Sequence, residues 1–231
     1  MNFSNVQFVL TDIEGTTTSV SFVYEVLFPY FRNNIHKLKD LTSLNEVKDA
    51  FQQTIEISKA EAITLSNDDE IIAQLLKWSL EDKKITPLKT LQGILWNEGY
   101  QSGEIKGHVY DEVADQLLIW KQNNIQMGVF SSGSIAAQKL IFGYSVSGDL
   151  TPYFSAYFDT TTGGKREKET YSKIAAKLDL EPNQILFLSD IVEELEAANE
   201  IGYQTVQLVR PGTDSKWEKT VADFSEIVII N

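Results

Sequence analysis

A buried-strand pattern that ends in acidic residues is the feature of this sequence that most constrains the fold. Residues 6–10 form an apolar run with one glutamine, and residues 11–17 follow as Thr-Asp-Ile-Glu-Gly-Thr-Thr. A short run rich in Val and Phe is typical of a strand buried in a parallel sheet. Ligands bind beyond the carboxyl ends of such strands, where Asp12 and Glu14 fall. One carboxylate there can act as a nucleophile and the other as acid and base. Alternatively, the strand ends in an ordinary polar turn, and Asp12 or Thr16 caps the next helix.

The overall composition excludes several classes of protein. The 231 residues include 33 acidic against 20 basic side chains, a net charge of -13, which argues against a partner such as nucleic acid or an anionic membrane. The absence of cysteine excludes disulfides and thiolate sites, and two histidines, His36 and His108, cannot form a three-histidine zinc site. No leader, membrane-spanning run or heptad seam is visible, so we expect a cytoplasmic monomer.

Residues 20–107 show only helical patterns. Apolar residues recur at helical spacing over 20–35 and in three further stretches between 44 and about 95. Pro29 should kink or divide the first of these helices, and Gly99 is a natural end for the last. We expect no strand in this region.

From residue 108 onward, predicted strands and helices alternate. This alternation favours a parallel sheet covered by helices on both faces. The sequence therefore predicts an α/β protein with a doubly wound, Rossmann-like core of residues 1–19 and 108–231 and a helical cap of residues 20–107 inserted after the first strand. Helices are predicted over 111–123, from Ser134, over 168–178 and over 193–201, and strands over 125–130, 156–158, 185–188 and 205–209. A final apolar segment spans 227–230.

Polar residues follow three more of the predicted strands. Asp12 and Asp190 arrive from different strands and suit a hard cation, with Mg²⁺ the best fit, although Asp190 could instead cap the next helix. Ser131 and Ser132 lie where a strand leads into a helix and could bind a phosphate, or form an ordinary polar turn. Lys165 could neutralise phosphate charge, or be a solvated surface charge. These polar clusters are expected at one edge of the sheet, and their joint pattern carries more weight than any one residue of it.

Together these motifs resemble the four motifs of the haloacid dehalogenase superfamily. Three stretches, residues 11–17, 91–100 and 131–134, are more specifically similar to the enolase-phosphatases of methionine salvage. Glu14 is the most diagnostic residue, because most phosphatases of the superfamily have aspartate there. The resemblance runs from about residue 8 to 212 and implies a core of the haloacid dehalogenase type with an inserted cap.

The resemblance implies a role for each motif residue. Asp12 is the nucleophile and a Mg²⁺ ligand, Glu14 offers its backbone carbonyl to the metal and its side chain as acid and base, Ser131 and Ser132 bind the substrate phosphate, Lys165 stabilises charge, and Asp190 completes the metal ligands. Two positions depart from the usual pattern. The last motif continues with Glu193 and Glu194 in place of a second aspartate, so Glu194 is expected at most to support the ligands, and Lys168 is a rival for the lysine role.

The family's reaction gives the expected function. Its members convert a small phosphorylated diketone, 2,3-diketo-5-methylthiopentyl 1-phosphate, through an enol phosphate to an acireductone and inorganic phosphate. The resemblance thus implies a Mg²⁺-dependent hydrolase with enolase activity. Two alternatives remain open at this point. One is a generic Mg²⁺-dependent phosphatase or phosphotransferase of the same fold, which Glu14→Asp would distinguish, and the other is a catalytically inactive binding module, which Mg²⁺-dependent turnover would exclude.

Overall fold

The computed structural model of the chain describes residues 1–230, which form two compact units. One unit comprises Met1–Val20 and Lys106–Asn231, whose last residue lies outside the described range, and the other comprises Ser21–Ile105. The second unit is thus an insertion in the sequence of the first. The assignment of 1–19 and 108–231 as a catalytic core, with 20–107 as its cap, stays a prediction.

A parallel sheet forms the centre of the first unit. Its strands are hydrogen-bonded in the order β4-β3-β2-β5-β6-β7. If these six strands are renumbered from 1 to 6 along the chain, the order is 3-2-1-4-5-6, as in a doubly wound Rossmann-type fold. This confirms the predicted α/β class. The order reverses between β2 and β5, so the carboxyl ends of these two strands flank the position where such folds bind ligands. Within residues 1–230 the six strands are β2 (Phe8–Thr11), β3 (Gln126–Phe130), β4 (Ala156–Phe158), β5 (Ile185–Ser189), β6 (Gln204–Leu208) and β7 (Thr220–Val221).

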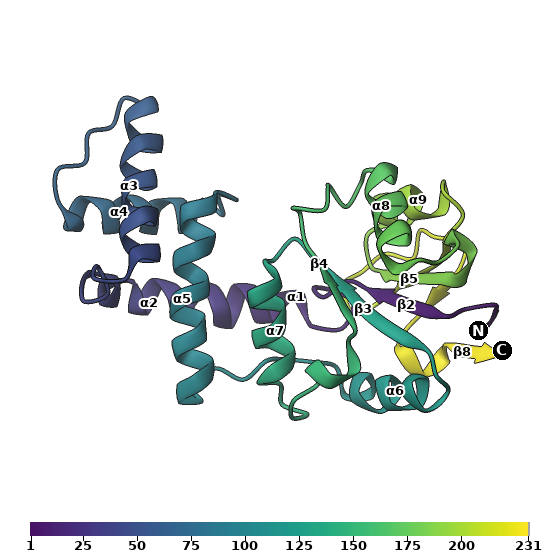
Figure 1. The fold of residues 1–231 in the computed structure, drawn as a ribbon. Helices are drawn as coiled ribbons and strands as arrows, with labels where there is room; N and C mark the ends of the chain where they lie inside the picture. The colour runs from purple at the N-terminus through teal and green to yellow at the C-terminus, as the bar shows by residue number, and fades with distance from the viewer. Residues whose placement is uncertain (231) are drawn as a thin grey trace. The chain divides into compact units, whose positions relative to one another are not determined.

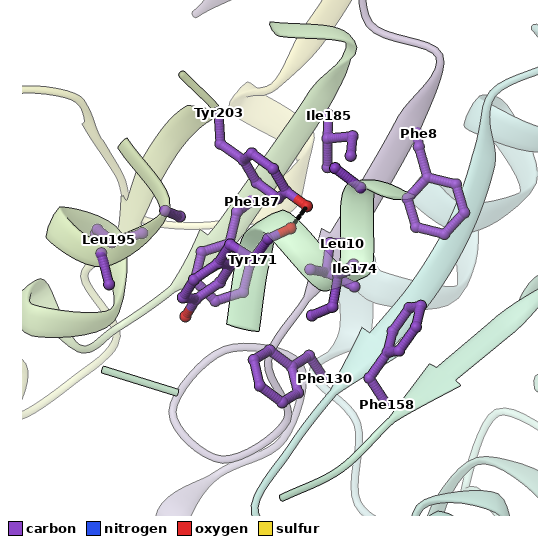
Figure 2. Packing of buried hydrophobic residues seen from close by; sticks show 13 residues of the cluster. Phe8, Leu10, Phe130, Phe158, Tyr171, Ile174, Ile185, Phe187, Leu195 and Tyr203 are labelled. Carbon is purple, nitrogen blue, oxygen red and sulfur yellow. Dashed lines mark hydrogen bonds between the residues drawn. The ribbon is translucent and has the colours of Figure 1, made fainter. Parts of the chain in front are cut away.

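Helices cover both faces of this sheet (Figure 1). Helices α8 (Lys168–Leu178) and α9 (Val192–Asn199) lie on one face, and α6 (Asp111–Gln122) and α7 (Ile135–Gly143) lie on the other. Figure 2 shows how Leu10, Phe130 and Phe187 from three strands surround Tyr171 of α8, whose carbonyl accepts a hydrogen bond of 2.9 Å from the Tyr203 hydroxyl. Burial of each large side chain contributes roughly 1.5–3 kcal/mol, so this cluster holds the strand ends in fixed positions.

The two ends of the described chain form a small sheet of their own. The apolar segment 227–230 does not join the main sheet. Its strand β8 (Val228–Ile230) pairs in parallel with β1 (Asn2–Ser4), and both lie near the chain termini in Figure 1. The sequence pattern did not predict β1 or β7, because strands of two or three residues carry no readable alternation.

The second unit is helical, and no strand lies among its described residues, as expected. Its core packs Phe31, Val47, Trp78 and Leu91, one from each of the four main helices, with no exposed surface left on the side chains. No helix within residues 1–230 has the length and apolarity needed to cross a membrane. The elements are α1 (Val20–Phe22), the π-helical turn η1 (Val23–Leu27), α2 (Phe28–Asn34), the 3-10 turn η2 (Ile35–Lys39), α3 (Asn45–Ala60), α4 (Asp68–Leu80) and α5 (Thr86–Ser102).

Pro29 and Gly99, which the sequence predicts to interrupt or end helices, act differently from one another in this unit. Pro29 is the second residue of α2, directly after the change from the π-helical turn η1, and the helical stretch continues through it. Gly99 does not end α5, so that prediction is wrong. The helix continues to Ser102 and stops at Gly103, which has a φ of 80°. Gly99 is required for close packing instead, because a Cβ there would lie 2.6 Å from the Tyr30 ring.

Candidate active site

Asp12 stands at the point where the strand order reverses. Its N–H donates to the Leu188 carbonyl of β5 at 2.9 Å, so it extends the pairing of β2 with β5 by one residue. The chain then turns sharply, because the N–H groups of residues 16–18 all donate to the Ile13 carbonyl at 2.9–3.1 Å. The Ile13 N–H donates to Asp12 Oδ1 at 2.7 Å. The turn therefore fixes a buried carboxylate, with 3% of its surface exposed, at the sheet edge.

Lys165 reaches this carboxylate from the loop after β4. Its Nζ lies 2.6 Å from Asp12 Oδ1 and 2.7 Å from Glu194 Oε2, and the side chain is buried. The Tyr171 hydroxyl donates to the Lys165 carbonyl at 2.6 Å and fixes the backbone of the loop. Burial alone would lower the pKa of Lys165, but the Asp12 and Glu194 carboxylates have the larger combined effect. The pKa of Lys165 is therefore raised above its ordinary value. The ammonium is therefore a permanent positive charge beside Asp12.

The rival lysine lies elsewhere. Lys168 is the first residue of α8, and its side chain is exposed and pairs with Glu200 at 3.2 Å. An exposed ion pair of this kind contributes little to stability. Of the two lysines that the sequence left open, Lys165 is the one in contact with Asp12.

Asp190 follows β5 and is half-buried. Its Oδ1 is buried without a hydrogen-bond partner, and burial, followed by the charge of Asp12, raises the pKa of Asp190 to about 7. Gly15 has a φ of 75° and passes so close that a Cβ there would lie 2.3 Å from Asp190 Oδ2. The alternative of a helix cap is wrong, because the N-cap of α9 is Ile191 and that helix start has no side-chain cap.

Glu194 has a larger part in the site than the sequence indicated. It lies in the first turn of α9, it is buried, and its Oε2 accepts a hydrogen bond of 2.9 Å from the Ser189 hydroxyl as well as the contact with Lys165. Burial, followed by Asp12, raises the pKa of Glu194 to about 7, and Lys165 opposes this rise. The sequence contains one indication of this role. Glu194 follows Asp190 by four residues, about one helical turn, so its side chain can lie near the same strand end.

The serine motif forms the turn between β3 and α7. The Ser131 side chain is buried and its hydroxyl accepts the Gly133 N–H at 3.1 Å, whereas its own N–H donates to the Phe158 carbonyl at 3.2 Å. Ser132 is exposed. Ser134 caps α7, as the helix start predicted near it requires. Phosphate binding by Ser131 and Ser132 stays a prediction.

Glu14 is half-buried within the turn after Asp12, and its charge contributes to the raised pKa of Asp190. The predicted metal donors are therefore two side-chain carboxylates, Asp12 and Asp190, and one backbone carbonyl. This set contains only two side chains. The described part of the chain has no group of three or more His, Cys, Asp or Glu side chains that could hold a metal ion. The residues fit a hard cation, because oxygen is its preferred donor and Asp190 Oδ1 has no other partner.

Comparison with known proteins identifies the family. Residues 6–202 match the model of haloacid dehalogenase-like hydrolases. "Enolase-phosphatase E1" of Picosynechococcus sp. is 49% identical over 227 residues, which cover 98% of this chain and 100% of that protein. The chain belongs to the enolase-phosphatase family. The enolase-phosphatase E1 of Methylococcus capsulatus is 50% identical over 224 residues, covering 96% of this chain and 97% of that protein.

A solved structure supports the same fold. The crystal structure of the UTR4 protein from Saccharomyces cerevisiae superposes with a TM-score of 0.79 at 33% identity, covering 96% of this chain and 99% of that one. The predicted resemblance to the enolase-phosphatases and the hydrolase class are thus confirmed. Haloacid dehalogenase-like hydrolases and enolase-phosphatases are generally metal-dependent.

Proposed function

We propose that the chain converts 2,3-diketo-5-methylthiopentyl 1-phosphate, through an enol phosphate, to an acireductone and inorganic phosphate in methionine salvage. Near full-length identity to enolase-phosphatases supports this proposal. The observation that carries it is the buried contact of Lys165 with Asp12 and Glu194 at the reversal of the strand order. A cytoplasmic location and a monomeric state stay predictions.

Phosphoryl transfer begins at Asp12. Its Oδ1 already accepts the Ile13 N–H and the Lys165 ammonium, so Oδ2 is the oxygen that attacks phosphorus. The bond between phosphorus and the substrate oxygen breaks, and Glu14 gives that oxygen a proton. Glu14 then takes a proton from the water that attacks the aspartyl-phosphate, and the bond from phosphorus to Asp12 breaks. Lys165 offsets the charge on the phosphoryl oxygens, and Ser131 and Ser132 hold the phosphate.

We propose Mg²⁺ as the metal, held by Asp12, Asp190 and the Glu14 carbonyl. The donor set is made of hard oxygens, and the buried Asp190 Oδ1 otherwise lacks a partner. When bound, Mg²⁺ supplies positive charge that offsets the phosphate and the enolate formed when a proton leaves the carbon next to a carbonyl.

The inserted unit has a role in this proposal. The enolate must be kept from water, and the helical residues 20–107 are the part of the chain available as a cap. A cap also restricts the substrate to small phosphoesters.

The test is turnover of the diketo-methylthiopentyl phosphate with and without Mg²⁺, with enol absorbance and released phosphate followed together. The enol should rise before phosphate appears, and Asp12→Asn should abolish only the second signal. Asp179→Asn is the matched control, because Asp179 is exposed with a φ of 55°, a conformation that asparagine tolerates well. Phosphate release from simple esters without any enol would support the generic phosphatase instead.

A further inference from the structure

Arg210 is a buried charge that none of the sequence motifs includes. It follows β6, and 5% of its surface is exposed. Its Nε and Nη2 both donate to the Thr16 carbonyl, at 3.1 and 2.8 Å, and its Nη1 donates to the Ala222 carbonyl at 3.2 Å. Nη2 also pairs with Glu112 Oε1 at 2.5 Å, and the guanidinium stacks on the Tyr110 ring at 3.9 Å. All these groups belong to the unit that contains Asp12.

The contact with Thr16 bears on the site because the preceding residue of the same turn lies against Asp190. Gly15 packs directly on the Asp190 carboxylate, so closely that no Cβ would fit. The turn is thus in contact with the Asp190 carboxylate at Gly15 and is bound by the Arg210 guanidinium at the Thr16 carbonyl. Glu14, one residue earlier, offers both the proposed acid–base side chain and the proposed metal-binding carbonyl.

The shape of these contacts is specific to arginine. Two N–H groups of one planar fork converge on a single carbonyl while the flat face rests on an aromatic ring, which a lysine ammonium cannot reproduce. A purely structural ion pair would need only the bond to Glu112. The paired bonds to Thr16 point to a second task, which is to fix the turn that carries Glu14.

We propose that Arg210 is a positioning residue that holds the turn at the Thr16 carbonyl so that Glu14 keeps its place relative to Asp190. It acts through the turn and touches no substrate. This inference rests on the proposed function, because it assigns Arg210 to the step in which Glu14 transfers protons and to the oxygens that bind the metal.

Arg210→Lys is the informative variant, since it retains the charge and loses the fork. We expect kcat to fall about 10- to 100-fold with KM nearly unchanged, and the affinity for Mg²⁺ alone, measured by calorimetry, to fall by a similar factor. Glu112→Gln removes the ion pair but leaves the bonds to Thr16, so its kcat should be retained. Leu117→Ala, in the buried core of α6, lowers the melting temperature without touching the turn, and it should also keep kcat.

The outcomes separate positioning from general stability. A melting temperature that falls in Arg210→Lys while kcat and Mg²⁺ affinity equal those of the wild type would overturn the proposal. A loss of kcat in Leu117→Ala as large as that in Arg210→Lys would also overturn the proposal. If Arg210→Lys does not fold, Arg210→Gln keeps one donor group and serves in the same comparison. Failure of the wild-type chain to act on the diketone would reject the proposed function, whereas Mg²⁺ affinity would still test Arg210.

Discussion

Gly15 packs closely against Asp190 in the candidate site, and Gly15→Ala tests this contact directly. Gly15 has a φ of 75°, and a Cβ on it would lie 2.3 Å from Asp190 Oδ2 and 2.5 Å from Asp190 Cγ. The methyl group can fit only if the Asp190 carboxylate moves or the turn opens. Either movement displaces one of the two carboxylates that we propose to hold the metal.

The expected loss of stability has two parts. A left-handed backbone costs a residue with a Cβ about 1–2 kcal/mol, and forcing Asp190 away from a preferred rotamer costs about 1 kcal/mol more. Gly148→Ala isolates the first part, because Gly148 has a φ of 88° and no heavy atom within 4 Å of a built Cβ. The melting temperature of Gly15→Ala should therefore fall about 2–4 °C further than that of Gly148→Ala, the shift expected per kcal/mol at this chain length.

The assay compares both variants by thermal melting, Mg²⁺ calorimetry and turnover of the diketone phosphate. Gly148→Ala should keep the wild-type kcat and Mg²⁺ affinity, and Gly15→Ala should lose about 100-fold in kcat because an oxygen of the site is displaced by about 1 Å. The reasoning is refuted if Gly15→Ala shows the same melting temperature and the same kcat as Gly148→Ala.

Three further predictions concern charge, pH and packing. Lys165→Met should lower kcat about 10²- to 10³-fold, as loss of a buried charge-stabilising donor does, whereas Lys168→Met should leave steady-state rates unchanged. Burial lowers the pKa of His108 below its ordinary value of 6.5, so the unfolded chain binds more protons at this residue than the folded chain does. The free energy of unfolding of the wild type should therefore decrease as the pH falls through about 6. In urea denaturation, His108→Gln should show a smaller decrease over the same pH range. Gly99→Ala should cost about 1–3 kcal/mol by overpacking, and Gly93→Ala, in the same helix with open space around it, should gain up to about 1 kcal/mol by denaturant titration.

Much of the core could be predicted because periodicity is a local property. The boundaries of α8 agree with the prediction at both ends, and β3, β4 and β5 agree to within one residue, since apolar runs between polar turns mark buried parallel strands. The motifs predicted that Asp12, Ser131 and Asp190 follow strands of one sheet. That prediction needed only topology, because the carboxyl ends of parallel strands lie at the same edge.

The features that sequence reasoning missed depend on tertiary contacts. Gly99 and Gly103 are both plausible helix ends, and only the Tyr30 ring packed against Gly99 shows why the first is an interior residue. Arg210 precedes a Pro-Gly turn and looks like a surface charge, because nothing local indicates that its guanidinium reaches the Thr16 carbonyl, 194 residues away. Contacts across such separations have no sequence period.

The charges at the strand ends give a physical reason for a cation at this site. Asp12, Asp190 and Glu194 are three carboxylates that face one ammonium, that of Lys165. Burial and mutual repulsion raise the pKa of Asp190 and of Glu194 to about 7, so without a cation the site binds protons readily near neutral pH. A substrate phosphate adds further negative charge to the same place. A divalent cation beside Asp190 would balance the three carboxylates and the ammonium before the phosphate binds, and it would leave Lys165 to the phosphate. The charges of these four residues therefore favour a bound cation.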